Sequence, residues 1–273
     1  MRRPGSASRA VVLVMGLSLW AGPRARAADA PKKPAVDPDA IAALRKMGAF
    51  LRTQESMEVQ SETTTDDVLP SGQKVQFGGT VDLKARRPDR QSVNVTSDRK
   101  NERLFYDGKV FTVYQPTLGY FASFPAPPTL AALVDVLEQR YGVDLPLADL
   151  FRLGTDDKQL AAIKGATMVG WSTVKGAVCA HYAFHQSDVD WEIWIQDGAQ
   201  PLPRKLVVTT TSEKIQPQHV SVMSWNLTPK LDEQAFTFVP PPNAQRIDFD
   251  VSSQTPATRQ GRSARARKAG GTP

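Results

Sequence analysis

Three histidines, one cysteine and three pairs of acidic residues are the side chains of this sequence that could do chemistry. His181 and His185 have the four-residue spacing with which a helix presents two ligands to one metal ion. Their neighbours alternate as in a β-strand, and four strand residues span roughly 13 Å, which is too far for one metal ion. Cys179 shares a strand face with His181, but no third group completes a nucleophilic site. We therefore predict structural or surface histidines and a buried, unreactive thiol, with a thiol that links a partner as the alternative.

The acidic pairs are Asp66-Asp67, Asp156-Asp157 and Asp188 with Asp190. The first two fall in polar, turn-like segments, where carboxylates are usually solvated. The third lies at a turn between two expected strands and offers too few oxygen ligands for calcium, which takes about six to eight. The sequence has no nucleophile elbow, phosphate-binding loop or dinucleotide fingerprint. We predict no catalytic residue, no metal site and no cofactor.

Apolar and aromatic residues on alternating strand positions are the more informative pattern. In VDWEIWIQDG, Trp191, Ile193 and Ile195 share one strand face, and in KVFTVY, Phe111 and Val113 share another. Such faces either pack into an ordinary core or line an apolar cavity. Periodicity favours neither interpretation, because both need apolar side chains that point inward.

The elements that position these residues change period along the chain. A helix is predicted over about 39–52, behind Asp37 as its cap and Pro38 at its first position. Eleven segments that follow are typical of strands, mostly joined by short turns, among which Asp107-Gly108 is a strong hairpin signal. Helical segments interrupt the strands within 129–164, including short helices at 146–151 and 156–164. The pattern predicts an α+β fold, in which one antiparallel meander forms a curved sheet or incomplete barrel covered by helices.

The segment YFASFPAPPTLAALVDVL, residues 120–137, joins an aromatic strand to an amphipathic helix through three prolines. The helix is predicted over 129–141. Its apolar stripe consists of Leu130, Leu133, Val134, Leu137 and Tyr141. Two interpretations stay open: the stripe closes an ordinary core, or it covers a cavity for an apolar ligand.

The two ends of the chain differ in composition from its body. Residues 1–27 have a basic start, an apolar run of 11 residues and a small-x-small cleavage sequence, which predict a secretory signal peptide too short to span a membrane. Residues 28–38 are typical of a linker, 39–250 of a single domain, and 251–273 of a disordered tail with five basic residues. Without its two ends the chain is mildly acidic, which argues against nucleic acid as a partner. We expect a soluble, exported protein.

Five blocks of the sequence carry a family resemblance: DPDAIAALRKMGAFLR, FYDGKVFTVYQP, FPAPPTLAALVDVLEQRYGVDLPLADLF, VDWEIWIQDGAQPLPRKLVVTT and FTFVPPPNAQRI. Together they resemble an uncharacterised family of predicted periplasmic proteins over about 37–248. That family is similar to the LolA/LolB-like lipoprotein-carrier superfamily, which implies a half-open barrel of about eleven antiparallel strands covered by helices. It also implies a Gram-negative periplasm and acyl chains or lipidated partners as ligands. The ligand-gripping arginine of the true carriers has no match, so lipoprotein transport is not implied.

Two hypotheses about function follow. The first is a periplasmic carrier or sensor, expected to be monomeric, whose half-barrel holds an acyl chain or a lipidated ligand. The second is an envelope protein-interaction or stress-sensing module whose core is filled by its own side chains. The predicted lining of the apolar cavity consists of Phe77, Phe105, Phe111, Val113, Tyr120, Phe121, Phe124, Leu130, Leu133, Leu137, Trp191 and Ile193. Peripheral contact of the basic tail with membranes is a further expectation.

Overall fold

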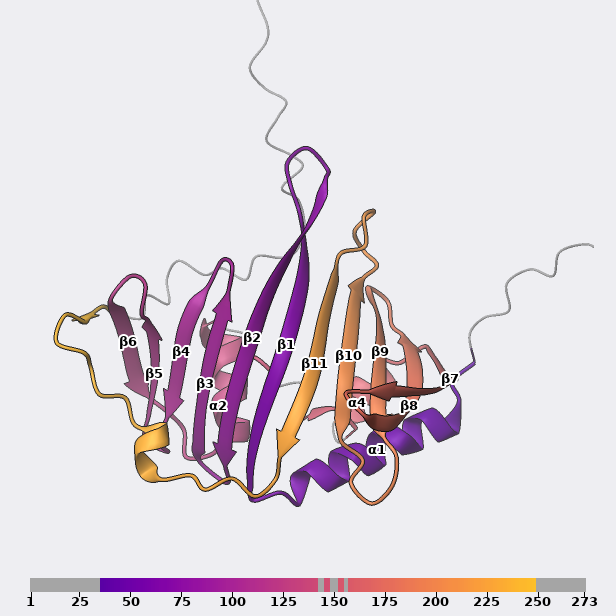
Figure 1. Ribbon diagram of the computed structural model, residues 1–273, viewed down its shortest axis with the longest axis horizontal. Helices are drawn as coiled ribbons and strands as arrows, with labels where there is room; N and C mark the ends of the chain where they lie inside the picture. Colours follow the sequence, from indigo (N-terminus) through magenta and orange to yellow (C-terminus); the bar gives the residue numbers. More distant parts are fainter. Residues whose placement is uncertain (1–34, 142–144, 148–151, 155–156, 249–273) are drawn as a thin grey trace, which may run out of the picture. The chain divides into compact units, whose positions relative to one another are not determined.

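The computed structural model describes residues 35–141, 145–147, 152–154 and 157–248 (Figure 1). The strands are β1 (Ser56–Val68), β2 (Lys74–Arg86), β3 (Arg90–Ser97), β4 (Asn101–Tyr106), β5 (Val110–Gln115), β6 (Tyr120–Pro125), β7 (Gly165–Val174), β8 (Ala177–His185), β9 (Val189–Gln196), β10 (Pro203–Thr210), β11 (Gln218–Asn226) and β12 (Gln245–Arg246). The helices are α1 (Pro38–Arg52), α2 (Leu130–Val136), the π-helix η1 (Leu137–Tyr141), α4 (Asp157–Ala161) and the 3₁₀-helix η2 (Glu233–Phe236).

The described strands form one sheet in the order β12-β6-β5-β4-β3-β2-β1-β11-β10-β9-β8-β7. Every pair is antiparallel except β12 with β6. The prediction of an α+β fold with a large antiparallel sheet is confirmed, and the short β12 is a twelfth strand that was not expected. The prediction of a single meander is wrong, because strands β1–β6 and β7–β11 form two meanders that are joined where β1 pairs with β11. The chain between β6 and β7 therefore passes from one half of the sheet to the other, and α2 and α4 lie on this connection.

Local signals explain why α1 forms where the sequence predicts it. The carboxylate of Asp37 accepts a hydrogen bond from the backbone N–H of Asp39 at 2.9 Å, and Pro38 occupies the first turn. Both features favour a helix start, because the first N–H groups of a helix lack partners within the helix. One face of the helix is buried, and it carries Ala40, Leu44, Met47 and Leu51.

The junction between β6 and α2 is held by backbone and side-chain hydrogen bonds. The hydroxyl of Thr129 caps α2 by accepting a hydrogen bond from the N–H of Ala132 at 3.2 Å. The hydroxyl of Tyr106 donates to the carbonyl of Pro127. The N–H of Leu130 donates to the carbonyl of Pro88 at 2.9 Å. The proline segment is thus fixed against the neighbouring hairpins.

Two apolar clusters cover one face of the sheet, here called the inner face. The first core consists of Met57, Val59, Val81, Leu83, Ala85, Val93, Leu104, Tyr106, Phe111, Phe124, Leu133, Val134, Leu137, Tyr141, Leu145 and Met223. The second core consists of Ala40, Leu44, Met47, Leu51, Ile163, Ala166, Phe184, Trp191, Ile193, Ile195 and Leu202. Thus α2 with η1 covers the β1–β6 half, and α1 covers the β7–β10 half. Leu153, Leu206, Trp225 and Leu227 pack against both cores and join them.

Several predictions concern residues outside the described ranges. They are the signal peptide over 1–27, most of the linker, and the basic tail over 251–273. Most of the short helix predicted at 146–151 also lies outside, whereas the one predicted at 156–164 corresponds to α4. Among the described helices, none has the length and apolar character needed to span a membrane.

Candidate functional site

The structure divides the predicted cavity residues among several places. Six of them belong to the first core or pack against it: Phe111, Val113, Phe124, Leu130, Leu133 and Leu137. Trp191 and Ile193 belong to the second core. Leu133 and Leu137 are 0% exposed, and the rings of Phe111 and Phe124 lie 5.4 Å apart. The apolar stripe of α2 and η1 therefore closes a packed core where Leu133 and Leu137 lie.

The other four predicted residues lie elsewhere. Phe105 and Phe121 project from the opposite, outer face, where their rings lie 5.4 and 5.1 Å from the ring of Phe238. Their predicted place in an inner cavity is therefore wrong. Side chains along a strand alternate between the two faces, and the chain neighbours Leu104 and Ala122 are the ones that point to the inner face. Tyr120 is 41% exposed at the side of the sheet. Phe77 lies on β2 beyond the first core, with the guanidinium of Arg99 4.6 Å from its ring centre.

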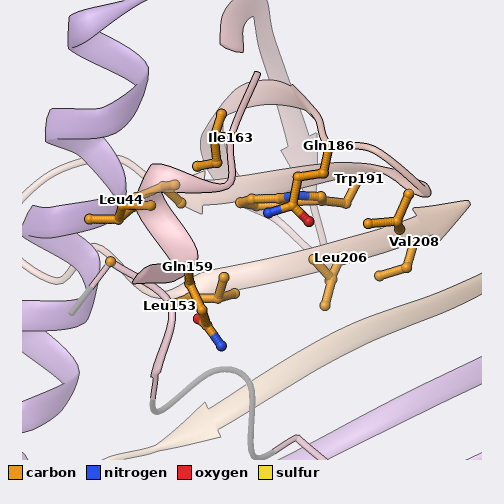
Figure 2. A pocket seen from close by; sticks show the side chains of 11 residues that line it. Leu44, Leu153, Gln159, Ile163, Gln186, Trp191, Leu206 and Val208 are labelled. Carbon is orange, nitrogen blue, oxygen red and sulfur yellow. The ribbon is translucent and has the colours of Figure 1, made fainter. Parts of the chain in front are cut away.

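A cavity of about 180 Å³ lies in the second core, on the side of α1 that faces the sheet (Figure 2). It is bordered by α1, the loop before α4, α4 with the residues that follow it, and strands β9 and β10. Its lining consists of Leu44, Leu153, Gly154, Gln159, Leu160, Ile163, Gln186, Val189, Trp191, Leu206 and Val208. Trp191 is the one predicted residue in this lining.

The sheet wall of the cavity is held by pairing and by ring stacking. Trp191 pairs with Val208 on β10 and with Phe184 on β8. The rings of Trp191 and Phe184 are stacked, with centres 4.0 Å apart and planes at 14°. Such aromatic pairs contribute about 0.5–1.5 kcal/mol beyond the area they bury, so the stacking stabilises this wall.

The wall opposite the sheet depends on Gly154. Its φ of 76° lies in the left-handed region, which glycine adopts without strain. A Cβ added there would lie 1.9 Å from the carbonyl oxygen of Leu44 in α1. The loop thus rests directly on the helix backbone, and only glycine allows this approach.

The polar side chains of the lining are the amides of Gln159 and Gln186, and no lining residue is ionisable. The amide oxygen of Gln159 is buried and has no hydrogen-bond partner among the described residues. An unpartnered buried polar atom is costly, and ligands or water commonly satisfy it. The lining therefore suits an uncharged apolar group that carries at most one or two hydrogen-bonding atoms.

His181, His185 and Cys179 lie in strand β8 and His219 lies in strand β11, and none of them lines this cavity. A ring nitrogen of His181 is 2.7 Å from the carboxylate of Glu192, and one of His185 is 2.6 Å from that of Asp190. Cys179 is fully buried, as predicted, and burial raises the pKa of its thiol. Within the described ranges, no three His, Cys, Asp or Glu side chains group closely enough to hold a metal ion.

Most of the lining was missed by reasoning from sequence. In the sequence, Leu44 is only one of several apolar residues in the helix predicted over about 39–52, and Val208 is only one residue of an expected strand. Gly154 could have been singled out as a glycine between helical segments, a position where positive φ or close approach is common. For Gln159 and Gln186 the sequence carries no signal.

Comparison with known proteins identifies the family. The family described as "Predicted periplasmic protein (DUF2092)" matches residues 40–250. The chain belongs to this family. A comparison with curated proteins gives no match.

Solved structures that align with this chain include two lipoproteins and a LolA-superfamily protein. Lipoprotein LppX of Mycobacterium tuberculosis aligns with a TM-score of 0.47 and 14% identity, over 72% of this chain and 100% of that one. LprF of Mycobacterium bovis aligns with a TM-score of 0.43 and 12% identity, over 77% and 100%. The LolA superfamily protein NE2245 of Nitrosomonas europaea aligns with a TM-score of 0.36 and 14% identity, over 73% and 97%. The family of this chain is thus one of predicted periplasmic proteins, and the chain itself forms an open, mostly antiparallel sheet.

Proposed function

We propose that this family member is a periplasmic binding protein, not an enzyme, which holds the end of an acyl chain in the cavity under α1. The observation that carries the proposal is the apolar cavity of about 180 Å³ in the second core. Apart from Gly154 and the amides of Gln159 and Gln186, its walls are leucine, isoleucine, valine and tryptophan side chains, and no charge lines it. Transfer of apolar surface from water into such a site is favourable in proportion to the area buried.

The size of the cavity defines how much of a ligand it holds. An apolar cavity of about 150 Å³ binds a molecule as small as benzene, whereas sites for larger ligands measure about 300–1,000 Å³. The cavity therefore accommodates a short apolar segment, such as the end of a fatty acyl chain. The Gln159 amide, which has both donor and acceptor atoms, would meet a polar group of that ligand or a water molecule.

A second candidate, an envelope protein-interaction module, is favoured by the edge of β7 beyond Ala166, where the bridge to Val36 ends. Trp171 is 60% exposed and Val169 55% exposed on this strand, which carries no charged residue from Gly165 to Val174. Sheet edges without charges are prone to pair with another extended chain. The partner in this case is an extended, apolar segment of an envelope protein.

Titration with a fluorescent fatty acid, together with native mass spectrometry, tests the first candidate. Val208→Phe places a larger side chain in the cavity and should weaken binding about tenfold or more. Val222→Phe is the matched control, because Val222 is half-buried on the outer face of the neighbouring strand β11. It should leave affinity unchanged.

The first candidate fails if no fatty acid or phospholipid binds the wild-type protein, or if the two variants bind equally well. Should the protein stay empty while a peptide is captured and Trp171→Ser abolishes this capture, the second candidate holds.

A further inference from the structure

A row of polar side chains lies on the inner face of the sheet, next to the cavity under α1. Val208 pairs with His219 on β11, and Leu206 pairs with Ser221. Side chains that lie opposite each other on neighbouring strands share a face, and their Cβ atoms are about 4.5–5.5 Å apart. Because Leu206 and Val208 line the cavity (Figure 2), its sheet wall continues onto β11 with His219 and Ser221.

The polar row extends onto β1, the next strand of the sheet. Thr65 pairs with His219, and Thr63 pairs with Ser221. Ser61 precedes Thr63 by two positions on β1 and therefore lies on the same face. We call this group the polar strip, and its members are Ser61, Thr63, Thr65, His219 and Ser221.

His219 connects two hydroxyl groups of the polar strip. One ring nitrogen lies 2.8 Å from Oγ1 of Thr65, and the other lies 3.0 Å from Oγ of Ser221. Burial lowers the pKa of His219, so at neutral pH the ring is neutral, with one N–H and one accepting nitrogen. It therefore donates to one hydroxyl and accepts from the other. In either case Ser221, which is 1% exposed, keeps at least one hydrogen-bonding position for a further group.

Ser61 is the member of the polar strip whose hydroxyl has no partner. It is 2% exposed, and its Oγ atom forms no hydrogen bond with another described residue. A buried hydroxyl without a partner is costly, and ligands or ordered water commonly complete such a site. The amide oxygen of Gln159 has the same property. One unpartnered polar atom thus lies in the cavity lining, and another lies two strands from β10, about 10 Å along the sheet.

No charged side chain lies beside the polar strip in the register of the described strands. Its neighbours on β2 and β10 are phenylalanine, glycine, valine and leucine residues. The next inner-face position along β1 is Asp67, whose carboxylate is bound to the guanidinium of Arg99. A charged headgroup in the strip would therefore lack a counter-ion among the described residues, and burial of an unpaired charge is costly.

We propose that the polar strip binds an uncharged, hydroxyl-bearing head of the ligand whose acyl chain end enters the cavity. The ligand class is therefore an acyl ester of a neutral polyol, not a free fatty acid. This inference rests on the function proposed above. Hydroxyl groups of such a head can both donate to and accept from Ser61 and Ser221. The carboxylate of a free fatty acid only accepts, and its charge would stay uncompensated in the strip.

Competition for a bound fluorescent fatty acid tests the polar strip at neutral pH. Monopalmitoylglycerol and palmitate are the competitors, because they have the same acyl chain and differ in the head. The glyceride should displace the fluorescent fatty acid at a concentration about tenfold lower than palmitate does. In the double variant Ser61→Ala, Ser221→Ala this difference should shrink to about twofold or less, whereas the affinity for palmitate should remain that of the wild-type protein.

Two further variants show that the effect belongs to the inner face and not to the fold. Ser92→Ala, Ser224→Ala is the matched control, because both serines are half-buried on the outer face, on β3 and β11. It should keep the full preference for the glyceride. Ser61→Ala alone removes a hydroxyl that has no partner, so it should weaken glyceride binding without lowering the melting temperature.

Three results would overturn the polar strip. They are equal displacement by the two competitors in the wild-type protein, an unchanged preference in the Ser61→Ala, Ser221→Ala variant, and an equal loss of affinity for both competitors in that variant. Val208→Phe should weaken both competitors alike in every case where the cavity proposal is correct. Failure of the cavity proposal looks different: the fluorescent fatty acid does not bind the wild-type protein at all, and the inference about the strip falls with it.

Discussion

Replacement of Gly154 by alanine tests whether the loop before α4 must rest on the backbone of α1. Gly154 has a φ of 76°, and its added Cβ would lie 1.9 Å from the carbonyl oxygen of Leu44. Gly176, in the turn between β7 and β8, has a φ of 80° and nothing within 4 Å of an added Cβ among the described residues. Both alanine variants carry the strain of a left-handed backbone, but only Gly154→Ala adds a steric clash.

The two variants should differ in their free energies of unfolding. A left-handed alanine costs about 1–2 kcal/mol, which is the whole effect expected for Gly176→Ala. To restore an ordinary contact of 3.4 Å at Gly154, the loop or the helix must shift by about 1.5 Å. Overpacking of this kind adds about 1–3 kcal/mol, so Gly154→Ala should lose about 2–5 kcal/mol in total.

Urea unfolding followed by tryptophan fluorescence measures both losses, and fatty acid titration measures the effect on the cavity. Gly154→Ala should also change affinity, because it moves the wall that carries Leu153. Equal losses of stability in the two variants would refute the steric argument. An unchanged unfolding midpoint in Gly154→Ala would do the same.

Three further predictions concern the cores and their titratable groups. Leu133→Ala should cost about 2–5 kcal/mol in urea unfolding without changing fatty acid affinity, because Leu133 is fully buried in the first core and the cavity lies in the second. Burial raises the pKa of Tyr106 to about 12. The stability that the protonated hydroxyl contributes is therefore fully present below the pKa of about 10 in the unfolded chain, and it is lost as the pH rises towards 12. Tyr106→Phe should not show this loss of stability in unfolding curves measured across that pH range. Burial lowers the pKa of His219 below the usual 6.5 of a histidine. The stability that this group contributes is therefore present above pH 6.5 and is lost as the pH falls through the lower pKa of the folded state. The His219→Gln variant should show a flatter pH dependence of its melting temperature on acidification.

Elements with local signals were predictable from the sequence. The bounds of α1 follow within a few residues from the Asp37 cap, from Pro38 and from the apolar residues of that helix. Most strands follow from the alternation of apolar and polar residues between turn residues. The Asp107-Gly108 hairpin also forms as expected: Gly108 has a φ of 86° and the Asp107 carboxylate accepts from the N–H of Val110 at 2.8 Å. Each of these features depends on residues that are close in the chain.

The faces of β4 and β6 could not be assigned in the same way. Both strands carry apolar residues on each face, such as Leu104 beside Phe105, so alternation alone does not say which face is inner. The outer face is occupied by Phe238, which comes more than a hundred residues later in the chain. The cavity was unpredictable for a related reason, since it depends on where α1, α4 and the Gly154 loop stop short of the sheet.

The pairing of β1 with β11 also determines how this sheet can assemble. Within each meander, neighbouring strands are mostly consecutive in the chain, whereas this pairing joins Glu58 to Asn226, 168 positions apart. Closure of so long a loop is entropically costly, and folding slows as contacts become less local. We therefore expect the two half-sheets to form first and their union to limit the rate of folding. Until then the β1 and β11 strands are open edges, so a newly exported chain is most exposed to aggregation and to chaperones in this interval.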